Sequence, residues 1–125
     1  MQDMPFTNTM PLSRRALLQK TVLVRRAYLE PENIPGYSKD IDLEDGSYRL
    51  GRSSECEIRL SLNNISRVHS RIGKRGEDYI LEDENSTNGT YVNGIQVLRC
   101  VLRDGDLLEI GEAKLHFFEE KVRIK

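Results

Sequence analysis

Five residues in three separate stretches of the sequence carry side chains that could bind an anion. Arg52 follows a glycine at the end of a strand-like run, Ser66 and Arg67 end a polar loop, and Thr87 and Asn88 lie in a loop rich in hydroxyls and amides. Guanidinium groups form bidentate hydrogen bonds to phosphate, and hydroxyl and amide donors complete its coordination. Each stretch alone is typical of a solvated loop. If the three loops meet at one end of the fold, together they suit a doubly charged tetrahedral anion.

The residues between these stretches have the pattern of short β-strands. Runs that are β-branched or alternate between polar and apolar residues are separated by Gly, Pro, Asn or Asp at intervals of about 8–12 positions. No long helix is predicted, so the pattern favours an all-β sandwich or barrel. The strand-like runs are 21–29, 40–43, 47–52, 57–60, 68–75, 78–82, 90–92, 95–102, 107–110 and 114–118.

The stretch 85–94 holds two Asn-Gly pairs, Asn88-Gly89 and Asn93-Gly94, on either side of Thr90-Tyr91-Val92. Asn-Gly favours tight turns because both residues tolerate a positive φ. Two such turns leave room for only one very short strand between them. We therefore expect the first pair to lie in a shaped loop and not in a simple hairpin. The preceding acidic run, Glu82-Asp83-Glu84, is interpreted as a strand end that runs into solvent.

The composition predicts one domain with short tails. A chain of 125 residues with a net charge of −1 can bury a core, and its charge balance indicates neither nucleic acid nor a membrane as a partner. The polar, proline-containing residues 1–20 are expected to form a tail, residues 21–120 the domain, and residues 121–125 a short C-terminal tail. Cys56 and Cys100 lack CxxC spacing and are expected to be free thiols. Without a predicted signal peptide or membrane helix, the chain is expected to be cytoplasmic.

Catalytic and metal-binding patterns are weak. His69 and His116 are the two histidines; a lone histidine such as His69 is more often structural than a ligand or base, and His116 alternates within an apolar terminal strand. Neither cysteine has a partner histidine at a usable spacing, and no phosphate-binding glycine motif occurs. The sequence therefore predicts a protein that is not an enzyme and has no metal or cofactor.

Several motifs together resemble the forkhead-associated (FHA) family of phosphothreonine-peptide-binding β-sandwiches. The similarity covers roughly residues 21–119 and rests on motifs in the family's order. It implies an antiparallel β-sandwich of about eleven strands with recognition loops at one end. The motifs are Gly51-Arg52, Ser66-Arg67-Val68-His69, Asn85-Ser86-Thr87-Asn88-Gly89-Thr90 and Asn93-Gly94.

The resemblance also implies a role for each matching residue. Arg52 and Ser66 would bind the phosphate directly, and Arg67 would add a contact to phosphate or peptide backbone. Thr87 would shape the pocket for the phosphothreonine methyl group, and Asn88 would bind the peptide main chain. Arg67 stands where several family members carry asparagine. The residues expected to support the site are Gly51, His69, Gly89, Asn93 and Gly94.

The predicted function is an adaptor that binds a phosphothreonine-containing partner downstream of a Ser/Thr kinase, as a monomer. Two alternatives stay open. The chain could be a phosphate-independent assembly module, although Arg52, Ser66 and Asn88 together argue against it. It could also inhibit itself by binding its own N-terminal tail, because small FHA proteins of the family do so. Thr7 and Thr9 are the candidate phosphorylation sites for this second alternative.

Overall fold

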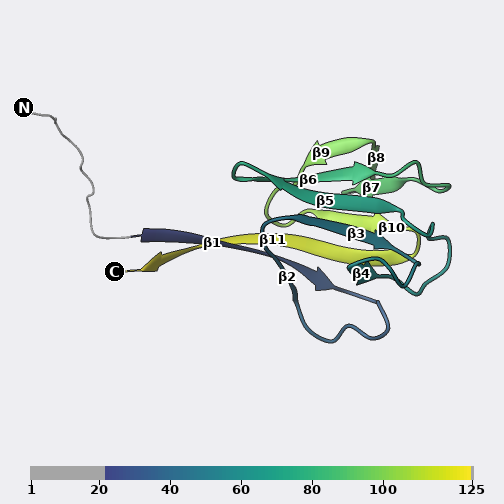
Figure 1. The fold of residues 1–125 in the computed structure, drawn as a ribbon, viewed down its shortest axis with the longest axis horizontal. Coiled ribbons are helices and arrows are strands. Elements are labelled where there is room, and N and C mark those ends of the chain that lie inside the picture. The colour runs from purple at the N-terminus through teal and green to yellow at the C-terminus, as the bar shows by residue number, and fades with distance from the viewer. Residues whose placement is uncertain (1–21, 125) are drawn as a thin grey trace, which may run out of the picture. The chain divides into compact units, whose positions relative to one another are not determined.

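The computed structural model describes residues 22–124, and every regular element in this range is a β-strand (Figure 1). Two sheets are formed, with strand orders β2-β1-β11-β10-β7-β8 and β4-β3-β5-β6-β9. The eleven strands confirm the predicted sandwich. The predicted tail at residues 1–20, with Thr7 and Thr9, lies outside the described residues. The predicted domain boundaries at 20 and 120 stay predictions.

The six-stranded sheet combines the two ends of the described chain with the central hairpin. Its strands are β1 (Val22–Pro31), β2 (Ile41–Leu43), β7 (Thr90–Val92), β8 (Ile95–Val97), β10 (Leu107–Ile110) and β11 (Ala113–Ile124). The five-stranded sheet consists of β3 (Ser47–Gly51), β4 (Ile58–Arg59), β5 (Ser70–Arg75), β6 (Asp78–Asp83) and β9 (Arg99–Val101).

Most neighbouring strands pair antiparallel, which fixes the ends at which their loops emerge. The exception is β4, which runs parallel to β3 and places Gly51 opposite Arg59. In the same sheet Leu50 pairs with Ser70, and Ser70 pairs with Asp83. In the other sheet Thr90 pairs with Ile110. The end of β3, the start of β5 and the end of β6 therefore lie in neighbouring positions at one end of their sheet.

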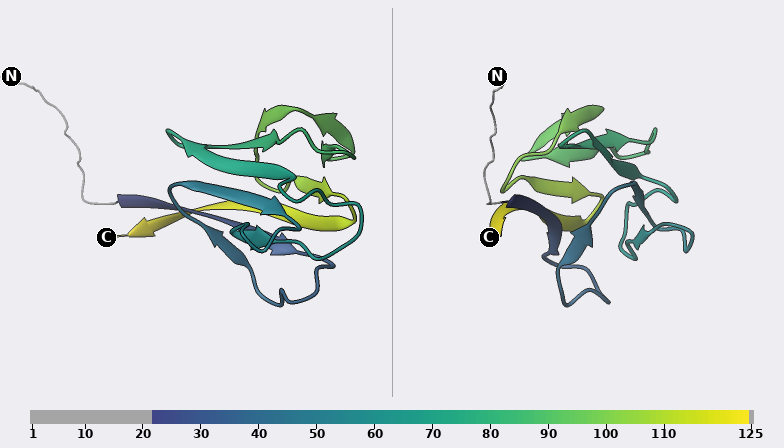
Figure 2. Two further views of the ribbon diagram at one scale, coloured as in Figure 1. Left: turned by 45° about the vertical axis from the view of Figure 1, so that its right-hand side comes forward. Right: turned by 60° about the vertical axis from the view of Figure 1, so that its left-hand side comes forward.

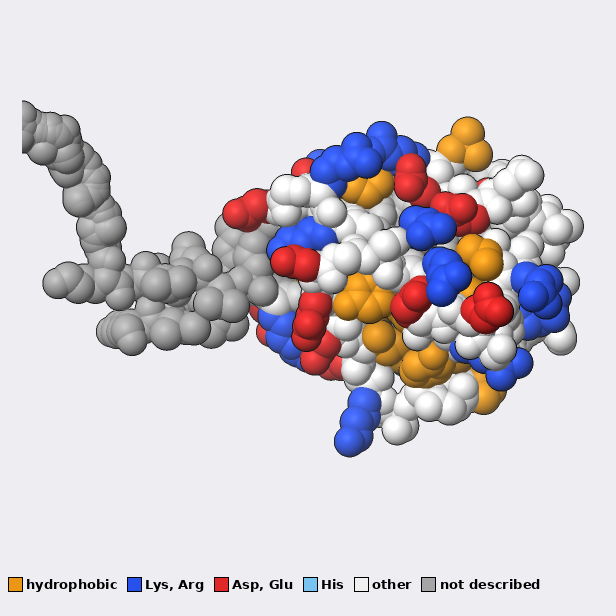
Figure 3. Space-filling view, viewed as in Figure 1, with side chains coloured by type: hydrophobic (Ala, Val, Ile, Leu, Met, Phe, Trp, Pro, Cys, Tyr) orange, Lys and Arg blue, Asp and Glu red, His pale blue; other side chains and the backbone are white. Residues whose placement is uncertain are grey.

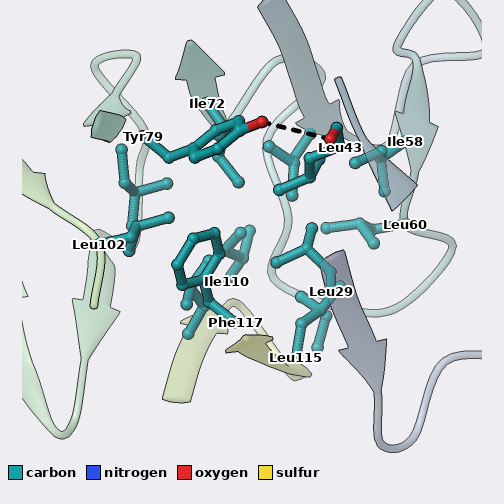
Figure 4. Packing of buried hydrophobic residues seen from close by; sticks show 14 of the residues in the cluster. Leu29, Leu43, Ile58, Leu60, Ile72, Tyr79, Leu102, Ile110, Leu115 and Phe117 are labelled. Atoms are coloured by element: carbon teal, nitrogen blue, oxygen red, sulfur yellow. Dashed lines mark hydrogen bonds between the residues drawn. The ribbon is translucent and has the colours of Figure 1, made fainter. Parts of the chain in front are cut away.

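The hydrophobic core fills the space between the two sheets, which face each other in Figures 1 and 2. The Tyr79 and Phe117 rings, from opposite sheets, have centroids 5.8 Å apart. The Tyr79 hydroxyl donates to the Leu43 carbonyl at 3.2 Å, so its polar group is satisfied (Figure 4). A fully buried side chain of this size contributes about 1.5–3 kcal/mol. The largest fully buried apolar side chains are Phe117, Leu29, Leu50, Ile58, Leu60, Ile72, Leu81, Leu108, Ile110 and Leu115.

The chain divides into two compact units. The larger is Ala27–Glu119 and holds the core. The described part of the smaller consists of residues 22–26 and 120–124, in which the Arg26 Nη1 atom lies 3.6 Å from Glu120 Oε1. β11 continues to Ile124, further than the run predicted from the sequence. No helix that could cross a membrane occurs in the described part of the chain. Cys56 and Cys100 are free thiols, as expected.

Candidate functional site

The end of β3 is tied directly to the loop that precedes β5. Arg52 donates its backbone N–H to the Ser66 carbonyl, and Ser53 donates to the Arg67 carbonyl, both at 3.0 Å. The two backbones approach so closely that a Cβ atom on Gly51 would lie 2.3 Å from the Arg67 carbonyl oxygen. Only glycine fits at this position, and its absence of a side chain brings Arg52 next to Ser66 and Arg67.

The Arg52 side chain is exposed but held in place. Its Nε atom donates to the Ile65 carbonyl at 3.2 Å. No hydrogen bond within residues 22–124 uses its two Nη groups, and none of the ion pairs found between described residues includes Arg52 or Arg67. Arg49 and Arg71, by contrast, are paired with Glu57 and Glu84. The loop end therefore presents uncompensated positive charge and free bidentate donors.

His69 braces two loops from inside the protein. Its fully buried ring accepts the Ser66 backbone N–H at Nδ1, at 3.1 Å. Its Nε2 atom lies 2.7 Å from the Gly89 carbonyl oxygen. Because a backbone N–H can only donate, Nδ1 is the acceptor, and Nε2 carries the proton that is donated to Gly89. Both ring nitrogens are used, which agrees with the structural role predicted for this histidine.

The third loop is joined to the second through Ser66. Thr87 donates its backbone N–H to the Ser66 Oγ atom at 3.1 Å. With its oxygen already accepting one hydrogen bond, the Ser66 hydroxyl still has its own proton to donate. Asn88 donates from Nδ2 to the Asn64 carbonyl at 3.3 Å, and both Thr87 and Asn88 are exposed. The structure thus brings together Arg52, Ser66, Arg67, Thr87 and Asn88, as the resemblance implied; we refer to these five residues as the loop cluster.

Asp83 shapes the loop that carries Thr87 and Asn88. Its carboxylate accepts hydrogen bonds from the Ser86 backbone N–H at 3.0 Å, the Ser86 hydroxyl at 2.5 Å and the Thr90 hydroxyl at 2.7 Å. The Ser86 Oγ atom in turn accepts the Gly89 N–H at 2.9 Å. Thr90 is fully buried and also contacts the Ser70 hydroxyl at 2.7 Å.

The interpretation of Glu82-Asp83-Glu84 as a solvent-exposed strand end is therefore wrong for Asp83. Burial raises the pKa of this carboxyl, but the hydrogen bonds from Ser86 and Thr90 outweigh burial and hold the pKa below its ordinary value. The spacing of an aspartate three residues before a serine is a signal for such a loop, since aspartate side chains bind nearby backbone N–H groups in turns.

The two Asn-Gly pairs have different roles. Gly89 has a φ of 89°, and a Cβ there would lie 2.7 Å from the Gln96 Nε2 atom. Asn93 and Gly94, with φ of 52° and 82°, form the two-residue turn between β7 and β8. Asn93 also accepts the Leu107 N–H at 2.9 Å. Asn93 and Gly94 lie at the opposite end of β7 from Gly89, so they support the strand and are not part of the loop cluster.

A pocket of about 260 Å³ opens beside Asn88. Glu112, in the turn between β10 and β11, is exposed at its edge and receives a hydrogen bond from Asn64 Nδ2 at 3.4 Å. The Asn64 carbonyl and Gly111 are packed so closely that a Cβ on Gly111 would lie 2.4 Å from the oxygen. Sequence reasoning missed Glu112. The pocket is lined by Asn64, Asn88, Gly89, Tyr91, Gly111 and Glu112.

No group of three or more His, Cys, Asp and Glu residues able to hold a metal ion is found among residues 22–124. The loop cluster presents guanidinium, hydroxyl and amide donors at the surface, and donors of this kind suit an anion. Figure 3 shows Lys and Arg side chains at the end to which β3 points in Figure 1.

Comparisons with known proteins show which domains the chain is similar to. FhaA, an FHA domain-containing protein of Mycobacterium tuberculosis, is 36% identical over 80 residues, which are 64% of this chain and 15% of FhaA. A solved structure from work on phosphothreonine-dependent FHA domain interactions matches with a TM-score of 0.68 and 32% identity, covering 74% of this chain and 95% of that one. The FhaA FHA domain, complexed with the intracellular domain of Rv3910, gives 0.67 and 33%, covering 73% and 98%.

The family model of the FHA domain matches residues 48–111, just over half of the chain. This range contains every residue of the loop cluster, from Arg52 to Asn88. The chain spans only a small part of the length of FhaA, so the similarity concerns the domain. The chain belongs to the FHA domain family.

Proposed function

We propose that this chain is an adaptor that binds phosphothreonine on a partner protein, within signalling by a Ser/Thr kinase. FHA domains are protein-interaction modules, and a related FHA structure at 32% identity comes from work on phosphothreonine-dependent interactions. The observation that carries the proposal is that three loops are joined by hydrogen bonds around Ser66, with Arg52 beside it. Arg52 forms no ion pair with an acidic side chain among the described residues.

The phosphate is held by Arg52 and Ser66. A phosphothreonine carries a charge of about −1.5 to −2 at neutral pH. The two Nη groups of Arg52 match two phosphate oxygens, and the Ser66 hydroxyl donates to a third. Arg67, whose side chain is exposed at the same loop, adds a contact to phosphate or peptide backbone.

The peptide chain is held by the third loop. Asn88 binds the peptide main chain, and Thr87 lines the space for the threonine methyl group. One methyl group in a pocket discriminates by about 1–3 kcal/mol, which would favour phosphothreonine over phosphoserine. Gly51, His69 and Gly89 set the loop positions through the contacts described above, and Asn93 and Gly94 hold β7 from its other end.

The test is binding to a degenerate phosphothreonine peptide library, beside matched phosphoserine and unphosphorylated libraries. We expect phosphothreonine-selective binding. Arg52→Ala should weaken it by about 2–5 kcal/mol, because one partner of a charge pair is lost. Ser66→Ala should cost about 1–3 kcal/mol, because a neutral donor is lost.

Arg103→Ala is the matched control. Arg103 is exposed in the loop between β9 and β10, and its backbone N–H binds Asp106 away from the loop cluster. The substitution Arg103→Ala removes one positive charge, as Arg52→Ala does, and leaves Arg52 and Ser66 unchanged. Equal binding by the parent and both site variants would refute the pocket assignment. Binding of the three libraries without selectivity would favour phosphate-independent assembly. Thr7 and Thr9 stay predicted phosphorylation sites of a self-inhibiting tail.

A further inference from the structure

Arg59 lies directly beside the proposed phosphate site, although no motif in the sequence marks it. It ends β4, the short edge strand that runs parallel to β3, and it pairs with Gly51. Leu60 donates its N–H to the Gly51 carbonyl at 2.7 Å, which holds this register. Arg59 is therefore one strand away from the residue that precedes Arg52.

The Arg59 side chain, like that of Arg52, donates its Nε–H to a backbone carbonyl. Its Nε atom donates to the Arg52 carbonyl at 3.0 Å. Its backbone N–H donates to the Tyr37 hydroxyl at 3.0 Å, which ties β4 to the loop between β1 and β2. As with Arg52, no hydrogen bond within residues 22–124 uses the Nη groups, and the residue is exposed. Both arginines are anchored by Nε and keep two Nη groups for a ligand.

At this end of the sheet, three arginines have no acidic partner among the described residues. Arg49, Arg71 and Arg99 each pair with a glutamate at 3.0–3.2 Å. Arg52, Arg59 and Arg67 take part in no ion pair between described residues. One phosphate, with a charge of at most about −2, does not neutralise three guanidinium groups.

We propose that Arg59 forms a second anion subsite, which selects phosphopeptides that carry a further acidic side chain. The second group is a carboxylate or a second phosphate on the same peptide. Neighbouring strands lie about 4.8 Å apart and an extended peptide advances about 3.3 Å per residue, so the second anion falls within about three residues of the phosphothreonine. This inference rests on the proposed function.

The test compares matched phosphothreonine peptides by fluorescence anisotropy. The first has neutral flanking residues, the second set carries one Asp at each position within three residues on either side, and the third set carries phosphoserine at the same positions. At one of these positions, we expect the Asp peptide to bind about two- to fivefold more tightly than the neutral peptide, the gain typical of an exposed ion pair. We expect about tenfold for phosphoserine, because of its larger charge and bidentate geometry.

The decisive quantity is the ratio of affinities for the anionic and neutral peptides, since any general effect of a substitution cancels in it. In Arg59→Gln the ratio should fall to about one, and in Arg59→Lys, which keeps the charge, part of the ratio should return. Arg103→Gln, the matched control, should leave the parent's ratio unchanged. The gain should also shrink as salt rises from about 0.05 to 0.5 M, because exposed charges are screened.

The outcomes separate the two proposals. If the parent binds no phosphothreonine peptide, the proposed function fails, and the second subsite fails with it. If the parent binds but no second anion improves affinity, only the inference is overturned. A gain that persists unchanged in Arg59→Gln overturns the assignment to Arg59. A gain with both Asp and phosphoserine supports a general anion subsite, and a gain with phosphoserine alone supports doubly phosphorylated partners.

Discussion

The Nδ1 atom of His69 accepts a hydrogen bond from the backbone N–H of Ser66 at 3.1 Å, and the His69 ring is fully buried. The other ring nitrogen donates to Gly89, on the loop that leads into β7. β5 and β7 belong to different sheets. One imidazole therefore fixes the distance between a loop of the five-stranded sheet and a loop of the six-stranded sheet.

Replacement of His69 by Ala should destabilise the fold and weaken phosphopeptide binding. Two backbone groups, Ser66 N–H and Gly89 C=O, would lose their partners, and a buried ring would leave a cavity. We expect a loss of about 3–5 kcal/mol in the free energy of unfolding. Urea denaturation followed by circular dichroism measures it.

His116→Ala is the matched control for this substitution. The His116 ring is partly exposed and its Nδ1 atom lies 3.8 Å from Glu32 Oε1. An exposed pair of this kind contributes at most about 1 kcal/mol. Equal losses in the two variants would contradict the role given to the buried ring.

Gly51→Ala should separate the two loops that carry Arg52 and Ser66. The added methyl group would meet the Arg67 backbone at 2.3 Å, and a backbone atom cannot turn away as a side chain does. We expect a loss of stability of about 2–4 kcal/mol, similar to overpacked core positions, and weaker phosphopeptide binding. Thermal unfolding and peptide titration measure the two effects.

Gly73→Ala provides the comparison within the same sheet. Gly73 lies in β5, and a Cβ there would come no closer than 4.0 Å to another residue's backbone. Alanine should be neutral or stabilise by up to about 1 kcal/mol, because it restricts the unfolded chain. If both glycine variants behave alike, the close approach at Gly51 does not position the site.

Asp83→Asn should loosen the loop that carries Thr87 and Asn88. The charged acceptor for Ser86 and Thr90 would be replaced by a neutral one, at a cost of about 1–3 kcal/mol. Because hydrogen bonds hold the pKa of Asp83 below its ordinary value, its stabilisation is complete above the ordinary pKa of a carboxyl group. It is lost as the pH falls through the lowered value.

The measurement is the difference in unfolding free energy between the parent and Asp83→Asn from pH 6 to pH 2. The difference should be constant at the upper end and shrink at the lower end. Asp45→Asn is a suitable control, since the Asp45 side chain is 89% exposed and pairs with Lys74 at the surface. A difference that grows on acidification would show that Asp83 is not stabilised in its charged form.

The Glu57 carboxylate should titrate with a pKa of about 2. Its side chain receives hydrogen bonds from the Arg49 guanidinium at 3.0 and 3.1 Å and from the Arg49 backbone N–H at 2.8 Å. These bonds favour the charged form and hold the loop between β3 and β4, which begins with Arg52. In Arg49→Gln the pKa should move back toward 4.5, the ordinary value. NMR titration of the Glu57 side-chain carboxyl carbon measures this pKa in the parent and in Arg49→Gln. A pKa near 4.5 in the parent would contradict the interaction of Glu57 with Arg49.

Glu112 should favour peptides with a basic residue that reaches the pocket beside Asn88. The pocket combines the Glu112 carboxylate with the Tyr91 ring, and both attract a Lys or Arg side chain. In a phosphothreonine library, Glu112→Gln should reduce enrichment of basic residues by about two- to fivefold at one position. Glu44→Gln, an exposed residue outside the pocket, should leave the enrichment unchanged.

Local patterns were enough to predict most of the strands, whereas the meeting of the loops was expected from the resemblance to the FHA family. Thr90–Val92 was predicted as a very short strand and is β7, and Asn93-Gly94 has the two positive φ angles of a tight hairpin turn. At the first Asn-Gly pair only Gly89 has a positive φ, and its loop passes from one sheet to the other. The prediction of a shaped loop is confirmed.

Features that depend on partners far along the chain could not be predicted. The alternation in 57–60 indicates a strand, but not that β4 pairs parallel to β3 and brings Arg59 beside Gly51. Asp83 belongs to an acidic run typical of solvent. Its spacing to Ser86 is a local signal, but its hydrogen bond to Thr90 forms because Thr90 is placed beside it at the start of β7. Glu112 reaches the site only because Gly111 packs against Asn64.

The His69 bridge makes the loop cluster a joint between the two layers, so occupancy of the site is coupled to the closure of the whole sandwich. A peptide that contacts Arg52 and Ser66 on one layer and Asn88 before β7 on the other connects the two layers and holds them together. Any opening that parts the layers divides the site and releases the peptide. By linkage, ligand at 100 times its Kd adds about 2.7 kcal/mol to the work of opening. In the cell, a phosphorylated partner would therefore also protect this domain from proteolysis.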